Sequence, residues 1–89
     1  MRPLPRAFNM PWGSGQIVEE ATCDNEWHSP TIQLLRYDDG QLGIRFCSYT
    51  HDGRFQRSPL MINAADLPEL RRGLEAAPGL AALLRQLVA

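Results

Sequence analysis

The chain has 89 residues, a formal net charge of −1 and a hydrophobic content of 44%. A chain this short forms one small domain that buries roughly two thirds of its unfolded surface, so its core is marginal and a partner chain would stabilise it. The composition is typical of a globular protein. The near-neutral charge excludes the strongly basic field of most duplex-DNA binders.

The cysteine content and the chain ends indicate the compartment. Cys23 and Cys47 are too few for a disulfide framework, and the N-terminal residues lack the apolar core of a signal peptide. The apolar run LAALL near the C-terminus is far too short to span a membrane. We therefore expect a cytoplasmic protein with reduced thiols and no membrane association.

The N-terminal 15 residues carry several structure-breaking residues and no hydrophobic periodicity: Pro3, Pro5, Pro11, Gly13 and Gly15. This composition predicts a flexible arm over residues 1–15 and a folded domain over residues 16–89. Residues 16–22 are predicted to form a strand. Residues 23–30 are predicted to form a loop, because Asp, Asn, Ser and Pro crowd them.

Residues 31–49, TIQLLRYDDGQLGIRFCSY, are two β-prone runs separated by Asp39-Gly40, a strong hairpin signal. A two-residue turn gives a core face on which three pairs meet: Tyr37 with Leu42, Leu35 with Ile44, and Gln33 with Phe46. The opposite face is then mixed apolar and basic: Ile32, Leu34, Arg36, Gly43, Arg45 and Cys47. A three-residue loop with a bulge at Gly40 shifts the pairing by one residue.

A second turn and a change of period complete the predicted fold. Asp52-Gly53 returns residues 54–62 antiparallel beside the preceding strand, and Pro59 places its neighbourhood at an edge or bulge. Asp66 then begins a helix that Pro78-Gly79 ends, and a second short helix follows. We predict an α+β domain, an antiparallel meander of about four strands followed by one or two C-terminal helices.

The two predicted helices carry apolar stripes too wide for so small a domain to cover. We predict that seven leucines form the interface of a homodimer: Leu67, Leu70, Leu74, Leu80, Leu83, Leu84 and Leu87.

Several motifs stand in a familiar order. Ile44-Arg45 follows the first turn, Tyr37 precedes it, Tyr49 (or Ser48 by strict spacing) follows the pair, and LMIN over residues 60–63 leads into the helix with Leu67 and Leu70 inward. This order resembles the single-stranded-DNA-binding domain of the transcriptional coactivator positive cofactor four. QIVEE and EWHSP resemble its small bacterial relatives, and the likeness covers roughly half to two thirds of the chain.

The resemblance implies a homodimer whose curved sheets offer channels for single strands, contacted by basic side chains and stacked aromatic rings. This chain departs from the family in a turn region, residues 50–59, that is shorter and less basic. Residues 31–60 also carry four Arg against three Asp.

The candidate binding set combines charge with flat side chains: Arg36, Tyr37, Arg45, Tyr49, Arg54, Phe55 and Arg57. Single-strand binding needs a cationic groove and aromatic platforms, and each stacked base is worth about 1–3 kcal/mol. The alternative is that Tyr37 and Phe55 pack in the core while the arginines solvate the sheet edges.

Other chemistries find little support. The spacing of Cys23, His28, Cys47 and His51 lacks the tight C-x2-C pair of zinc sites, so we expect no metal and no other cofactor. Asp38, Asp39 and Asp52 belong to turns, and no Ser, His and acid form a recognisable triad, so we expect no enzyme.

We predict a small transcription-related or genome-maintenance protein that binds single-stranded DNA or RNA on the sheet face of a homodimer. The rival is a dimeric protein-interaction module with the same fold and no nucleic-acid ligand. The net charge of −1 and the leucine-rich C-terminal segment favour the rival.

Overall fold

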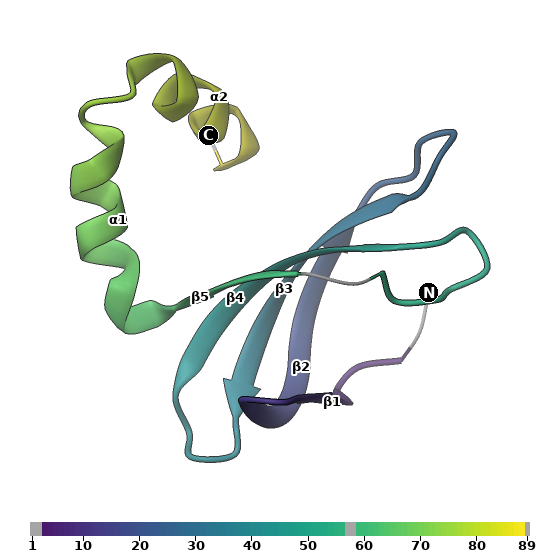
Figure 1. Ribbon diagram of the computed structural model, residues 1–89. Helices are drawn as coiled ribbons and strands as arrows, with labels where there is room; N and C mark the ends of the chain where they lie inside the picture. Colours follow the sequence, from purple (N-terminus) through teal and green to yellow (C-terminus); the bar gives the residue numbers. More distant parts are fainter. Residues whose placement is uncertain (1–2, 57–58, 89) are drawn as a thin grey trace.

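The computed structural model describes residues 3–56 and 59–88, which form an antiparallel sheet followed by helices. Within these residues the five strands lie in the sheet in chain order (Figure 1): β1 (Arg6–Met10), β2 (Gly13–Thr22), β3 (Ser29–Tyr37), β4 (Leu42–Tyr49) and β5 (Leu60–Asn63). A 3-10 turn (Ala64–Asp66), α1 (Leu67–Leu74) and α2 (Pro78–Val88) follow. The predicted α+β class is therefore confirmed.

The N-terminal segment is a strand where a flexible arm was predicted. Residues 6–10 pair with β2, which begins at Gly13 and not at Gln16. A Cβ at Gly15 would lie 2.1 Å from the carbonyl oxygen of Arg36, so glycine is needed for β2 to approach β3. The glycines that suggested an arm thus permit close strand packing, and the sheet gains a fifth strand that buries Phe8.

The β3–β4 hairpin has the three-residue loop, so the two-residue turn was the wrong alternative. The Tyr37 N–H donates to the Gln41 carbonyl oxygen over 2.8 Å, and Gly40 has a φ of 89°, the left-handed conformation of a bulge glycine. The register pairs Leu35 with Gly43 and Gln33 with Arg45. Arg45 therefore shares the face of Leu35.

The core lies on one side of the sheet, which we call the inner face. Phe8, Ile17 and Leu35 are buried there, and three further side chains pack against them: Met10, Tyr37 and Met61. The rings of Phe8 and Tyr37 meet edge to face with centroids 5.5 Å apart, a favourable aromatic geometry. The inner-face core is small, as expected for a domain of this size.

The opposite side, the outer face, is apolar but largely uncovered by the described chain. Its half-buried side chains come from three neighbouring strands: Ile32 and Leu34 of β3, Ile44 and Phe46 of β4, and Ile62 of β5. Leu87 of α2 lines the same cavity as Pro30 and Phe46. Leu70 of α1 borders a second cavity with Ile62, so within the described residues the helices approach the outer face at its margins.

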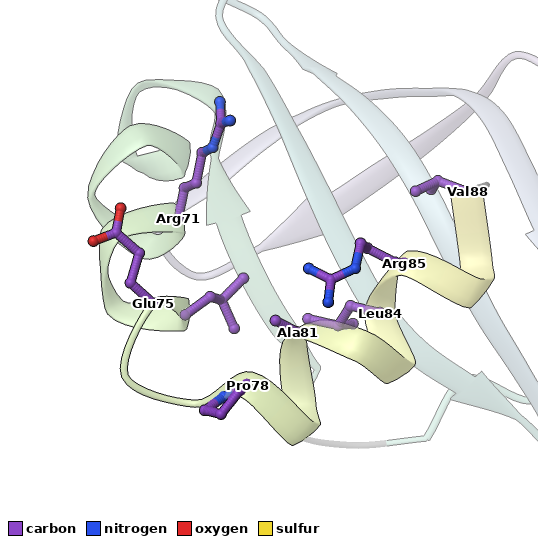
Figure 2. A pocket seen from close by; sticks show the side chains of 8 residues that line it. Arg71, Glu75, Pro78, Ala81, Leu84, Arg85 and Val88 are labelled. Atoms are coloured by element: carbon purple, nitrogen blue, oxygen red, sulfur yellow. The ribbon is translucent and has the colours of Figure 1, made fainter.

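The helices lie to one side of the sheet and pack mainly on each other (Figure 1). Figure 2 shows Ala81 and Leu84 of α2 facing the groove that α1 borders with Arg71 and Glu75; Leu74 lines the same groove. None of the described residues of α1 or α2 is buried. Across residues 3–56 and 59–88, no helix has the length and apolar character needed to cross a membrane.

Candidate nucleic-acid interface

The inner face continues beyond its apolar core into a set of hydrogen-bonded polar side chains, which we call the polar network: Arg6, Glu20, Gln33, Arg45 and Cys47. Strand alternation explains their meeting, because Glu20 of β2 is paired with Gln33 of β3, and Gln33 with Arg45 of β4. Tyr49, two residues beyond Cys47, joins them from the same face of β4.

Arg45 is buried, with 3% of its surface exposed. Its Nε donates to Oε1 of Gln33 over 2.7 Å. Its guanidinium carbon lies 4.6 Å from the ring centroid of Phe55 and 5.6 Å from that of Phe8, within cation–π range of both. Arg45 therefore contributes to packing on the inner face, and little of its surface is accessible to solvent or to a ligand.

Arg6 forms a two-point ion pair with Glu20 across β1 and β2. Its Nη1 and Nη2 donate to the two carboxylate oxygens over 2.9 and 2.7 Å. The hydrogen bond to Glu20 is the main reason that the pKa of Arg6 is raised above its already high ordinary value. Arg6 is therefore charged at any physiological pH, and its charge is balanced locally.

Gln33 connects the two arginines. Its Nε2 donates to Oε2 of Glu20 over 2.8 Å and to the Tyr49 hydroxyl over 2.9 Å, while its Oε1 also accepts from the Cys47 thiol over 3.3 Å. Burial is the main reason that the pKa of the Cys47 thiol is raised, although Arg45 opposes the shift. Among the described residues, no group of three or more His, Cys, Asp or Glu is placed to hold a metal ion.

An aromatic cluster of Arg45, Tyr49 and Phe55 borders this network. A β-bridge brings Phe55 beside Tyr49, and their rings meet at 68° with centroids 5.5 Å apart. Phe55 is 38% exposed. The cluster therefore offers one accessible aromatic surface with a buried cation beneath it.

The turn between Tyr49 and Phe55 carries an exposed cation of the predicted set, Arg54. The Thr50 N–H donates to the Arg54 carbonyl oxygen and Thr50 Oγ1 accepts from the Arg54 N–H, which closes the turn. The Arg54 side chain is 82% exposed and lies 3.6 Å from Asp52. Such an exposed pair is weak, so the Arg54 guanidinium is available to an incoming phosphate.

The remaining predicted residues lie elsewhere. Arg36 is exposed on the outer face, where it is paired with Gln16, and Tyr37 packs in the core against Phe8. Arg57 lies outside the described residues. The fold therefore brings together Arg45, Tyr49, Arg54 and Phe55, and it separates Arg36 and Tyr37 from them.

Trp27, which is not among the predicted site residues, is 74% exposed in the β2–β3 loop. Asn25 organises this loop, because its Oδ1 accepts from the backbone N–H groups of Trp27 and His28 over 2.8 and 3.0 Å. His51 Nε2 lies 2.7 Å from the Asn25 carbonyl oxygen, which joins this loop to the turn at residues 50–54. The composition of CDNEWHSP predicted a loop, but it did not predict that this loop contacts the turn at residues 50–54.

A polar cavity of about 380 Å³ opens at this end of the inner face, which we call the loop end. Its lining includes three side chains of the strands, Arg6, Glu20 and Tyr49. It also includes three residues in or beside the adjoining loops, Asp24, Ser29 and His51. Thr22 and Thr31, also in its lining, hydrogen-bond to each other over 2.9 Å. Its volume falls in the range of small-ligand sites.

Comparisons with protein-family models, with curated proteins and with solved structures find no significant match to this chain. The assignment of a function therefore depends on the geometry above.

Proposed function

We propose that the protein binds single-stranded DNA or RNA at the loop end of its inner face, as a homodimer related to positive cofactor four. The observation that carries the binding function is the exposed residue Phe55, whose ring packs against Tyr49 and which directly follows the exposed Arg54 in the chain. A flat apolar surface next to an exposed cation suits a base and its phosphate, and it needs no sequence-specific contact. Trp27, on the adjoining loop, adds a second exposed ring.

The uncovered apolar surface supports the homodimer. The chain exposes 6696 Å², whereas a folded monomer of 10.0 kDa exposes roughly 5,200 Å². The difference of roughly 1,500 Å² matches what one subunit of an obligate homodimer buries, about 1,000–2,500 Å². The radius of gyration of 14.1 Å also exceeds the value of about 12 Å typical of a compact domain this long.

The positions of the predicted interface leucines are consistent with a second copy as the cover. Five are exposed: Leu67, Leu70, Leu80, Leu83 and Leu87. Leu74 and Leu84 instead line the groove between α1 and α2 (Figure 2). A second copy over the exposed stripe and the outer face would leave the inner face, and so the aromatic cluster, open to a strand.

The rival function, a dimeric protein-interaction module without nucleic acid, also has a structural observation in its favour. Arg45 is buried beneath the aromatic cluster and Arg36 lies on the outer face, so neither of these predicted cations is available to a strand bound on the cluster. The rival shares the dimer and differs only in its ligand. It predicts that the protein binds no single-stranded DNA or RNA.

A titration decides between the two functions. A labelled oligothymidylate of about 12 nucleotides should bind at low ionic strength, and its affinity should fall as salt rises because phosphate binding releases counterions. Phe55→Ala should weaken binding about tenfold, since one stacked base is lost. Fluorescence anisotropy measures both effects.

Trp12→Ala is the matched control. Trp12 is an exposed aromatic residue of the β1–β2 turn, at the end of the sheet that holds the β3–β4 turn, far from Phe55. Its removal should leave the affinity unchanged. If the wild-type protein leaves the anisotropy of the oligothymidylate unchanged up to tens of micromolar, the nucleic-acid function is wrong and the rival stands.

A further inference from the structure

The polar cavity at the loop end has a charge pattern that distinguishes between the two parts of a nucleotide. Its charged lining residues are one cation, Arg6, and two carboxylates, Glu20 and Asp24. Arg6 is already neutralised by Glu20 at 2.7 Å, so Asp24 leaves the cavity with a local excess of negative charge. A phosphate would be repelled, and an uncharged group with hydrogen-bond donors would be favoured.

Asp24 is held in place on one wall. It accepts a hydrogen bond from the Ser29 hydroxyl, so its carboxylate is oriented by the neighbouring strand β3. A carboxylate has about four acceptor positions, so acceptor capacity remains for a ligand. Asp24 therefore lines the cavity with acceptor capacity left on its carboxylate.

Arg6 lies toward the other wall. Within the described chain its hydrogen bonds go to Glu20 and to the Tyr49 hydroxyl, the latter over 3.4 Å. A guanidinium has five donors in a planar fork, more than these three contacts use. Arg6 and Asp24 line the same cavity of about 380 Å³, a volume that has room for one planar base.

Guanine is the base that fits this pattern. Its Watson–Crick edge carries two adjacent donors, N1–H and the N2 amino group, which match the two oxygens of a carboxylate, while its O6 and N7 are acceptors for an arginine. Thymine and uracil offer a single donor between two acceptors. Cytosine and adenine each offer one amino group beside an acceptor, so they use one carboxylate oxygen only.

We propose that the polar cavity receives a guanine base of the bound strand, with Asp24 accepting from its Watson–Crick edge and Arg6 donating to its acceptor edge. This inference rests on the proposed single-strand binding and adds a base preference to it. The aromatic cluster holds the strand without regard to sequence, and the cavity beside it selects guanine at one position.

The test uses oligothymidylate and two versions with one central substitution, by guanine or by hypoxanthine, which lacks the N2 amino group. Guanine should raise the affinity about tenfold over thymine, the discrimination of one good bidentate contact, and hypoxanthine should lose most of that gain. Asp24→Asn keeps the acceptor for Ser29 but loses the anion. It should abolish the guanine gain, so that the guanine-containing and the all-thymine oligonucleotides bind with equal affinity.

Asp39→Asn is the control, since it makes the same change in charge on an exposed turn at the opposite end of the sheet. It should keep the guanine gain. Equal affinity for the three oligonucleotides, or an undiminished gain in Asp24→Asn, overturns the guanine site while the single-strand function stands. If no oligonucleotide binds, both fail. Competition by guanosine 5′-monophosphate as strong as that of the strand would assign the cavity to a free nucleotide and also overturn the inference.

Discussion

At the scale of single residues, Gln33 explains how two arginines and a glutamate are accommodated on a face with so small a core. Gln33 is 1% exposed and uses both ends of its amide, toward Arg45 on one side and Glu20 on the other. A buried amide is tolerated only when it is hydrogen-bonded, and an unpaired buried arginine would be far more costly. The inner face is therefore specific in its polar contacts as well as in its apolar ones.

The Cys47 thiol should be unreactive in the folded protein. Burial raises its pKa above the ordinary cysteine value, so folding favours the protonated thiol. This preference contributes to the stability of the folded protein at pH values below the pKa of the thiol in the unfolded chain. The contribution is lost as the pH rises through the pKa of Cys47 in the folded protein. At pH near 8, a usual alkylation condition just below the ordinary cysteine pKa, iodoacetamide should modify the exposed Cys23 and leave Cys47 largely unmodified, as read by peptide mass spectrometry.

Unfolding in guanidinium chloride provides the control for this labelling. Both thiols should then react, because the burial that protects Cys47 is lost. Equal labelling rates for Cys23 and Cys47 in the folded protein would contradict the hydrogen-bonded environment assigned to Cys47.

At the scale of the elements, the sequence located both turns between strands β3, β4 and β5 and the two helices, because Asp-Gly dipeptides and a change from period two to period three or four are local signals. The β3–β4 register predicted from a two-residue turn differed from the observed register by one residue, because Asp39-Gly40 suits a two-residue and a three-residue loop equally well. The observed register places the Tyr37 ring against Gly13 and Gly43 and puts Arg45 on the inner face. These are contacts between strands, and no local pattern contains them.

The same reasoning applies to the candidate site. Tyr49 and Phe55 could be predicted as neighbours, because they flank one short turn. The part played by Arg6 could not, because it reaches Tyr49 across 43 positions of the chain. β1 itself was missed because its flanking prolines and glycines, read locally, are typical of an arm.

Gly15 should be the glycine of the sheet least able to accept a side chain. The Cβ of Gly15→Ala would lie 2.1 Å from the Arg36 carbonyl oxygen and 2.8 Å from the Tyr37 Cα, and both are backbone atoms of β3. The strands must separate, so we expect a loss of about 3 kcal/mol in the free energy of unfolding. Urea titration followed by circular dichroism measures the change.

The control for Gly15→Ala is Gly79→Ala, in the first turn of α2. The added methyl group would lie in open space, and alanine favours the helix, so stability should be unchanged or higher by up to about 1 kcal/mol. Equal effects of the two substitutions would contradict the close approach of β2 to β3.

At the scale of the whole molecule, the two faces of the sheet differ in how completely their apolar side chains are buried. The inner face buries its apolar core and satisfies its polar groups, whereas the outer face and the helices together leave an apolar stripe exposed. One buried hydroxyl, Ser48 Oγ, has no hydrogen-bond partner within the described chain, and Ser48 lines the cavity between the outer face and Leu87. A second copy that covers this side would both bury the leucines and offer Ser48 a partner.

Leu83→Asp should therefore break the homodimer. Leu83 is 65% exposed at the centre of the α2 stripe formed with Leu80 and Leu87, so a carboxylate there costs little in a monomer and much in a buried interface. Ala82→Asp adds the same charge to the exposed side of α2 that faces away from this stripe, and it should leave the dimer intact. Sedimentation velocity should give a dimer for the wild type and for Ala82→Asp. It should give a monomer or an unfolded chain for Leu83→Asp. A wild-type protein that sediments as a monomer at high concentration would show that the exposed leucines serve some other contact.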